Sequence, residues 1–341
     1  MIHKIALMRG DGIGPELTDA TLKVLDAVQK MYGITLDLVE VDAGDDCLKK
    51  RGMALPEDTI RVLKSSEACL KGPVGETAAD VIVKLRLLFD LYANIRPLKS
   101  YPNTPYMRPD IDMLFVRENT EGVYRGLEFS IDENTTICLR VITRRGSERI
   151  ARYAFEMARK REKASRVTIV HKSNVMKITD GLFSKVCKEV AKEYPDISAD
   201  EMYVDAAAME LIRSPHIFDV IVTTNMFGDI LSDEASMTVG GLGMAPGANI
   251  GDKYALFEPV HGSAPKLAGK QVANPTSMIL ASKLMIEWLG KKHLFSSYME
   301  AANGIERALI ETLKANILTE DLGGTAKTSE FGGAVAKRIT G

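Results

Sequence analysis

Apolar and polar positions alternate along the first hundred residues in a way that predicts strands and helices in turn. An apolar run predicts a strand over 4–9, and apolar residues at helical spacing predict a long helix over 15–31. The same patterns predict strand 34–42, helix 57–64, short strand 67–71, helix 78–89 and strand 90–96. Strands that alternate with helices are typical of an α/β protein with a largely parallel sheet.

The pattern changes after residue 99, where extended pieces follow one another without a helix between them. Pieces over 112–117, 127–131 and 135–142 suggest an antiparallel or projecting section. Further on we expect helices over 147–161, 180–194, 275–289 and 298–314, strands over 167–171, 202–205 and 220–223, and Ser147 as an N-cap. The length of 341 residues favours about two domains. We place them at 1–98 plus 246–341 and at 99–245.

The composition excludes several classes of partner. Apolar residues make up 45%, charged residues 26%, and the net charge is -2, which gives no electrostatic reason to expect nucleic acid or an anionic membrane. No apolar run approaches the ~18 residues that cross a bilayer, and the N-terminus does not resemble a secretion signal, so we expect a cytoplasmic protein. The scattered cysteines Cys47, Cys69, Cys138 and Cys187 are interpreted as free thiols.

A glycine-rich turn, GDGIGP at residues 10–15, stands between the first predicted strand and the first predicted helix. This position suits the phosphate-binding turn of a Rossmann fold. The spacing does not, because the third glycine comes one residue early and Pro15 stands in its place. Acidic residues at Asp37, Glu40 and Asp42 lie near the offset of a ribose-binding carboxylate, but a strand that ends in acidic residues is common. We therefore interpret the turn as something other than a dinucleotide site.

Three arginines lie next to apolar residues at or near the ends of predicted elements. Arg86, Arg96 and Arg117 would be costly to bury there without partners. Because a guanidinium can bind a carboxylate through two hydrogen bonds, three converging arginines would suit a di- or tricarboxylate. Three separate structural ion pairs explain the same pattern, and spacing alone does not decide.

Two further features carry possible chemistry. Asp229 and Asp233 are four residues apart after a buried strand, so they share a helix face. Their hard oxygen atoms suit Mg²⁺ or Mn²⁺, although a solvated acidic face is the alternative. Lys172 ends an apolar strand and could act as a general base, although most such lysines are merely solvated.

Taken together, several motifs resemble those of the β-decarboxylating dehydrogenases, which include the 3-isopropylmalate, isocitrate and homoisocitrate enzymes. These motifs are GDGIGPE, DLYANIRP, VRENTEGVY, HKSNV, NMFGDILSDEAS and ALFEPVHGSAPKLAGK. The resemblance covers essentially the whole chain. It implies a non-Rossmann α/β fold of two domains that share a continuous, mostly parallel sheet with a projecting dimerisation arm. The 1–98 plus 246–341 domain would bind the cofactor, and 99–245 would hold substrate, metal and the dimer contacts.

The resemblance also implies the reaction and its residues. The chain would oxidise and decarboxylate a (2R,3S)-3-substituted malate with Mg²⁺ or Mn²⁺ and pass a hydride to NAD or NADP. Arg86, Arg96 and Arg117 would bind the malate. Metal ligands would be Asp205, Asp229 and Asp233, and catalytic residues Tyr124, Lys172 and Asp229. Asp205 and Lys172 would come from a second subunit, so a homodimer is the minimum and a tetramer is open. Cofactor contacts would be Gly72, Asn174, Glu258, His261, Gly262, Ser263, Ala264, Lys266, Asn274 and Asp321.

The helix before Arg86 bears on the choice of substrate. Isocitrate enzymes resemble one another in placing Ser and Asn six and four residues before this arginine, where this chain has Asp80 and Ile82. Ile82 and Val83 offer methyl groups that suit an isopropyl substituent, and GPVGETAADVIVKLR is similar to archaeal-type 3-isopropylmalate dehydrogenases. We therefore expect 3-isopropylmalate and a role in leucine biosynthesis. Isocitrate, homoisocitrate, and tartrate or a malate remain alternatives.

The cofactor signals conflict. NAD-using members resemble one another in having Asp at the position of Lys266, and a lysine there would attract the 2′-phosphate of NADP. The segment Glu320–Gly324 has the NAD-like form. We expect NAD to be used and NADP to be tolerated or preferred. A non-catalytic regulatory subunit or a plain binding module would not need the lysine, tyrosine and metal carboxylates together.

Overall fold

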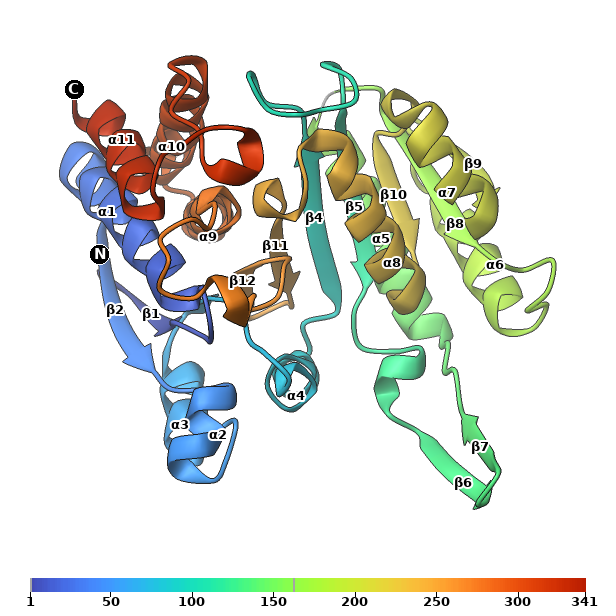
Figure 1. Cartoon of the computed structure of the whole chain (residues 1–341). Coiled ribbons are helices and arrows are strands. Elements are labelled where there is room, and N and C mark those ends of the chain that lie inside the picture. The colour runs from blue at the N-terminus through green and yellow to red at the C-terminus, as the bar shows by residue number, and fades with distance from the viewer. Residues whose placement is uncertain (1, 162) are drawn as a thin grey trace.

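Strand β1 (Ile2–Met8) lies near one end of a ten-stranded sheet that runs through the molecule (Figure 1). The computed structural model describes residues 2–161 and 163–341. The strand order is β2 (Thr35–Val41), β1, β3 (Ala68–Lys71), β12 (Ala255–Pro259), β11 (Pro246–Ile250), β4 (Ala93–Lys99), β5 (Asp112–Glu118), β10 (Val220–Thr223), β8 (Arg166–His171) and β9 (Ser198–Tyr203). Strands pair in parallel at both ends, whereas β12, β11, β4 and β5 pair antiparallel. The mixed, mostly parallel α/β sheet confirms the expected fold class.

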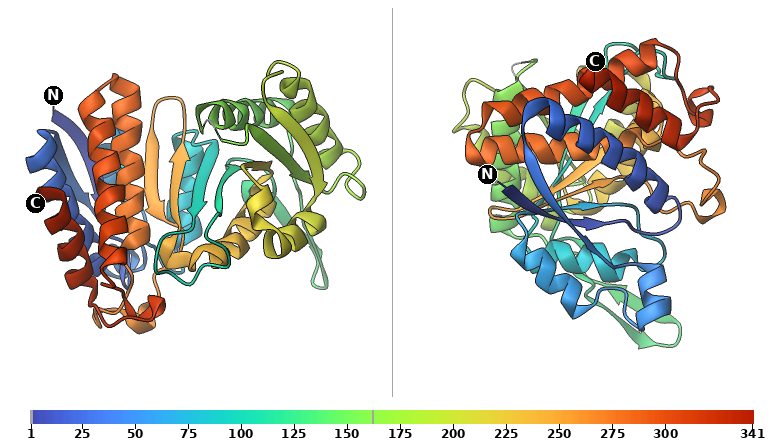
Figure 2. Two further views of the ribbon diagram at one scale, coloured as in Figure 1. Left: turned by 90° about the horizontal axis from the view of Figure 1, so that it is seen from above. Right: turned by 90° about the vertical axis from the view of Figure 1, so that its left-hand side faces the viewer.

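Helices cover both faces of this sheet. They are α1 (Gly14–Tyr32), α2 (Asp45–Arg51), α3 (Glu57–Ser65), α4 (Lys84–Leu88), α5 (Arg144–Arg161), α6 (Thr179–Ala191), α7 (Val204–Arg213), α8 (Asn225–Ser236), α9 (Thr276–His293), α10 (Ser296–Lys314) and α11 (Thr328–Thr340). Helix α5 packs on β5 and β10, and α9 packs on β11 and β12. Figure 2 shows α5 and α8 on opposite sides of the sheet. The largest apolar core lies under α1, α5, α9 and α10.

Several local predictions were wrong. Helix α5 begins at Arg144, so Ser147 is not its N-cap, and the Ser147 hydroxyl donates to the Thr143 carbonyl at 2.8 Å as in a helix interior. The strand expected over 202–205 ends at Tyr203, and Asp205 already belongs to α7. Helices α2, α7 and α11 and the β11–β12 pair were not predicted. The domain boundaries stay a prediction.

The glycine turn at residues 10–14 packs against two other loops, one at Gly75 and one at Ser263. The Asp11 carboxylate accepts the Gly75 backbone N–H at 3.0 Å, and the Ile13 N–H donates to the Ser263 carbonyl at 2.9 Å. A Cβ on Gly12, which has φ +57°, would come 2.0 Å from the Ser263 oxygen. The turn therefore needs glycine for close packing against the 263 loop, which agrees with a non-Rossmann fold.

A separate two-stranded hairpin, β6 (Glu128–Asp132) and β7 (Thr135–Cys138), extends away from the body (Figure 1). Every residue of β6 is exposed, and its apolar side chains Phe129 and Ile131 are 53% and 60% exposed. An isolated two-stranded hairpin is at best marginally stable in water. The arm therefore exposes apolar side chains that the body of this chain does not cover.

Two other expectations concern membranes and thiols. Over residues 2–161 and 163–341, no helix has both the length and the apolar character needed to cross a membrane. All four cysteines are free thiols, as expected: Cys47, Cys69 and Cys187 are buried and Cys138 is exposed.

Candidate active site

A cavity of about 330 Å³ brings together side chains that are far apart in the sequence. Its walls come from the turn before α4, from β4 and β11, from α8 and from the loop after β12. Among the lining residues are Lys71, Ile82, Val83, Arg86, Asn94, Arg96, Tyr124, Asp229, Glu258, His261 and Gly262. The cavity thus collects predicted substrate, catalytic and cofactor residues in one place.

Arg96 on β4 is held against helix α8. Its two terminal nitrogens donate to Asp233 Oδ1 at 2.7 Å and to Asp229 Oδ1 at 3.0 Å, and its Nε donates to Asn94 Oδ1 at 2.9 Å. The side chain is 7% exposed. The guanidinium is fixed by these bonds before any ligand enters.

Arg117 on β5 is buried more deeply than Arg96. The residue is 1% exposed; its Nη1 donates to Asp229 Oδ1 at 2.5 Å, and its Nη2 donates to Asn225 Oδ1 at 2.6 Å. Burial, together with the nearby Arg96 and Arg86, lowers the pKa of Arg117 to about 9. A bound carboxylate would therefore favour the charged guanidinium.

Arg86 on α4 lines the cavity. Its Nε donates to Asn249 Oδ1 at 3.0 Å, and its Nη2 lies 3.7 Å from Glu258 Oε1. Glu258 also pairs with Lys71 at 2.8 Å. Burial opposes ionisation of Glu258, but Lys71 and Arg86 outweigh it and lower the pKa to about 2. Arg86 and Arg96 therefore line this cavity; Arg117 does not line it but is joined by an ion pair to Asp229, which does.

Asp229 is the centre of the charge network. It accepts from Arg117, from Arg96 and from the Tyr124 hydroxyl. Burial opposes its ionisation, but Arg117 and Arg96 lower its pKa to about 2. Burial raises the pKa of Tyr124 despite the nearby Arg117. At neutral pH Asp229 is a carboxylate and Tyr124 is a protonated hydroxyl that can donate.

The pair Asp229 and Asp233 fits a divalent cation in its donor chemistry. Both carboxylates lie on one face of α8 and remain partly exposed, with side chains 34% and 48% accessible. Within the described residues, no third acidic, His or Cys ligand lies close enough to complete a cluster with them. Two carboxylates from one chain leave room for substrate oxygens and for one further ligand.

Lys172 and Asp205 lie together but away from this cavity. Lys172 Nζ is 2.5 Å from Asp205 Oδ1, and the Asp205 side chain is 66% exposed. The hydrogen bond from Lys172 lowers the pKa of Asp205. Neither residue lines the cavity of its own chain. This placement leaves both residues accessible to a second subunit.

The predicted cofactor residues are only partly gathered. Glu258, His261 and Gly262 line the cavity, and Lys266 follows as an exposed residue of the same loop. Within this set Asn274 donates to Asp321 Oδ2 at 3.0 Å. Ser263 and Ala264 belong to this loop, Gly72 packs against Arg9 and Gly14, and Asn274 and Asp321 lie together beside Gly243.

Asn174 stands apart from the other predicted cofactor residues. It is exposed two residues after Lys172, and the cavity of its own chain does not include it. Burial lowers the pKa of His261 in the cavity, so its imidazole is neutral near pH 7. A neutral ring suits contact with a flat, uncharged base.

The wall before Arg86 is apolar. Ala78, Ala79, Ile82 and Val83 face the cavity, and the backbone over Ala79–Val83 forms one π-helical turn instead of the expected α-helix. Asp80 faces away and pairs with Lys84 at 2.8 Å, with both side chains at least 60% exposed. A substrate group on this wall would meet methyl groups and no carboxylate.

Four positioning residues were missed in the sequence. Asn94, Asn225 and Asn249 each hold one of the arginines, and Lys71 pairs with Glu258. The signal was present, because a polar side chain within an otherwise apolar strand, such as Asn249, needs a buried partner.

Comparisons with known proteins agree with this geometry. The family model described as isocitrate/isopropylmalate dehydrogenase matches residues 4–335. The chain is 53% identical to a 3-isopropylmalate/3-methylmalate dehydrogenase of Methanocaldococcus jannaschii, with 99% of both chains covered. It is 48% identical to a 3-isopropylmalate dehydrogenase of Saccharolobus solfataricus, covering 97% of this chain and 98% of that one. A solved isocitrate dehydrogenase from Methylococcus capsulatus is 43% identical, with TM-score 0.91 and coverage of 99% and 100%.

Proposed function

Because this chain belongs to the isocitrate/isopropylmalate dehydrogenase family, we propose that it oxidises and decarboxylates 3-isopropylmalate to 2-oxoisocaproate, a step of leucine biosynthesis. The observation that carries the substrate choice is the apolar wall of Ala78, Ala79, Ile82 and Val83. An isopropyl group would bury its methyls there, whereas a third carboxylate would lose its water without gaining a partner. Initial rates with competing malates test the proposal.

The arginines bind the malate part of the substrate. Arg86 and Arg96 line the cavity and Arg117 is bonded to Asp229 in its wall, so the two carboxylates common to all 3-substituted malates would have cationic partners. Their side chains are already oriented by Asn94, Asn225 and Asn249. This pre-organisation holds the substrate in one orientation without extra ordering on binding.

Asp229 and Asp233, with Asp205 of the partner subunit, would hold Mg²⁺ or Mn²⁺. Such an ion supplies Lewis acidity that makes the substrate hydroxyl more acidic and withdraws electrons during the loss of CO₂. NAD or NADP supplies the hydride acceptor. Because Asp229 and Asp233 lie beside Arg96, they would keep this acidity next to the bound malate.

Proton movements fall to two other side chains. Lys172 of the partner subunit would take the proton of the substrate hydroxyl as the hydride leaves. Tyr124 is held by its bond to Asp229, and its raised pKa keeps the proton available for the enol carbon after CO₂ is lost. Base and acid would therefore be separate residues, the base from the partner subunit and the acid from this one.

We propose a homodimer on the basis of the same placement. Exposed apolar side chains gather on the arm and on α7 and α8, among them Phe129, Ile131, Met209, Ile212 and Ile230. Such exposure is typical of a surface that another chain covers. Dimerisation through this surface would bring Lys172 and Asp205 to the partner's site, and a tetramer would need a further contact.

Lys266 allows a test of the cofactor preference. We expect Lys266→Asp to raise the ratio of kcat/KM with NAD to kcat/KM with NADP by about tenfold. The substitution removes a positive charge that would attract the 2′-phosphate of NADP, and it adds a carboxylate that can accept hydrogen bonds from the ribose diol of NAD. Lys270→Gln, an exposed change four residues on, serves as control. An unchanged ratio for Lys266→Asp removes this residue from cofactor selection.

A further inference from the structure

A second cavity lies on the other face of the sheet, directly behind the candidate active site. Residues alternate between the two faces along each strand. On β4, Arg96 lines the active site and Ile95 lines the second cavity, and on β12 the same holds for Glu258 and Phe257. The second cavity has a volume of about 390 Å³, within the range of small-molecule sites.

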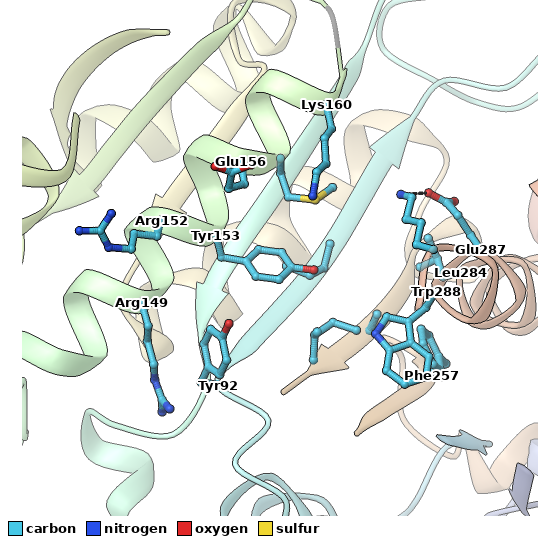
Figure 3. Close-up of a pocket in the computed structure, with 15 residues that line it drawn as sticks. Tyr92, Arg149, Arg152, Tyr153, Glu156, Lys160, Phe257, Leu284, Glu287 and Trp288 are labelled. Atoms are coloured by element: carbon cyan, nitrogen blue, oxygen red, sulfur yellow. Dashed lines mark hydrogen bonds and ion pairs between the residues drawn. The ribbon is translucent and has the colours of Figure 1, made fainter. Parts of the chain in front are cut away.

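The floor of this rear cavity is apolar and its walls are two helices. Strand residues such as Ala248 and Phe257 form the floor, α5 contributes Tyr153, and α9 contributes Leu284 and Trp288 (Figure 3). Phe257 and Trp288 pack edge to face, with ring centres 6.2 Å apart. Rings and branched chains on three sides would accept a flat or branched apolar body of modest size.

Hydrogen-bond donors point into this apolar space. In Figure 3 the Tyr153 hydroxyl is directed across the cavity toward α9, and the Trp288 indole nitrogen faces α5. Burial raises the pKa of Tyr153 and raises that of Tyr92 to about 12, so both hydroxyls keep their protons at neutral pH. These groups can donate to an acceptor on a ligand.

The rim carries more positive than negative charge. Four basic residues line the cavity: Arg149, Arg152, Lys160 and Lys291. Only two acidic residues do so, Glu156 and Glu287. Glu287 is already neutralised by Lys283 at 2.9 Å and Lys291 at 2.5 Å. Arg149 and Arg152 also have carboxylate partners.

Lys160 is the cation left for a ligand. Within residues 2–161 and 163–341 it makes no ion pair, and Figure 3 shows its side chain reaching from α5 toward the middle of the cavity. Lys160 also lines a neighbouring cavity of about 260 Å³, which shares several lining residues with the rear cavity. A ligand whose anionic group binds Lys160 would have its apolar part over the floor of the rear cavity.

We propose that the rear cavity binds a small amphipathic monocarboxylate, with its carboxylate at Lys160 and its apolar body between Tyr153 and Trp288. Such a ligand would bridge α5 and α9 behind the active site.

The fluorescence of Trp288 tests the binding directly, because it is the only tryptophan of the chain. Titration of the purified protein with 3-phenylpropionate, without substrate or cofactor, should give a saturable change in emission. Its neutral amide should bind more weakly. Lys160→Gln should weaken the affinity for the carboxylate about fivefold and leave the amide unchanged. Lys192→Gln, a change of the exposed lysine that follows α6, should behave as the parent.

Two results would overturn the proposal. One is a Trp288 emission that does not saturate with 3-phenylpropionate. The other is equal affinity in the Lys160→Gln and parent proteins, which would place the ligand elsewhere, for example at Arg86 and Arg96. Parallel thermal unfolding curves show whether each variant is folded. Because the titration needs no turnover, it stands or falls separately from the enzymatic assignment.

Discussion

Replacement of Asp229 by Asn should lower kcat by about a thousandfold or more. The loss of a charged metal ligand would cost several kcal/mol of transition-state stabilisation, and this energy corresponds to a factor of that size. The carboxylate would ligate the ion, and it also joins Arg96, Arg117 and Tyr124. Asn keeps the size of the side chain and one accepting oxygen. Steady-state rates over a range of Mg²⁺ concentrations measure the effect, and the apparent Mg²⁺ affinity should fall with kcat.

The matched control is Asp80→Asn. Asp80 is exposed, faces away from the cavity and pairs only with Lys84 among the described residues, so its loss should leave kcat within about twofold. Thermal unfolding distinguishes lost chemistry from lost folding in Asp229→Asn. A folded Asp229→Asn protein with kcat within tenfold of the parent would rule out this aspartate as a metal ligand.

Replacement of Lys172 by Gln should lower kcat by about a thousandfold and change KM little, because a general base contributes roughly 10²–10⁴-fold. Lys172 lies outside the cavity of its own chain, beside Asp205. Lys177→Gln, an exposed lysine on the same loop, is the control and should keep parental rates. A Lys172→Gln protein that is fully active would remove the base from the mechanism.

The shared site gives Lys172→Gln a second and sharper readout. Asp229→Asn and Lys172→Gln subunits, each inactive alone, should regain about a quarter of parental activity when unfolded and refolded together, because each mixed dimer has one intact site. Two Lys172→Gln preparations refolded together should stay inactive. No recovery from the mixed refolding, with dimers present, would show that Lys172 and Asp229 act within one chain.

Most strands and helices in the outer parts of the fold could be predicted from the sequence. Strands such as β1 and β8 are mostly buried and largely apolar, and helices such as α1 and α10 have strong apolar periodicity. The β11–β12 pair was missed because its first strand, PGANI, begins with Pro and Gly and has no alternating pattern. Burial on both faces in the middle of the sheet removes the signal of period two.

Some residues of the candidate active site could also be predicted from the sequence, and others could not. Arg86, Arg96, Arg117 and Asp229 were found because charges next to apolar runs must be paired when buried. Their convergence depends on strand order, which places β4 between β5, the next strand along the chain, and β11, which is distant in sequence. The helical start of Asp205 was missed, since MYVDAAAM continues an extended pattern until the alanines begin. Contacts between subunits leave no local pattern, so Lys172 was placed by resemblance alone.

The initial rates of the purified enzyme with 3-isopropylmalate, isocitrate and homoisocitrate, each with Mg²⁺ and with NAD or NADP, test the central assignment most directly. The apolar wall of Ile82 and Val83 predicts that kcat/KM for 3-isopropylmalate leads by about tenfold or more, as the burial of a few methyl groups allows ~1–3 kcal/mol of discrimination. If isocitrate or homoisocitrate leads instead, the wall does not select the substrate and the assignment to 3-isopropylmalate is wrong.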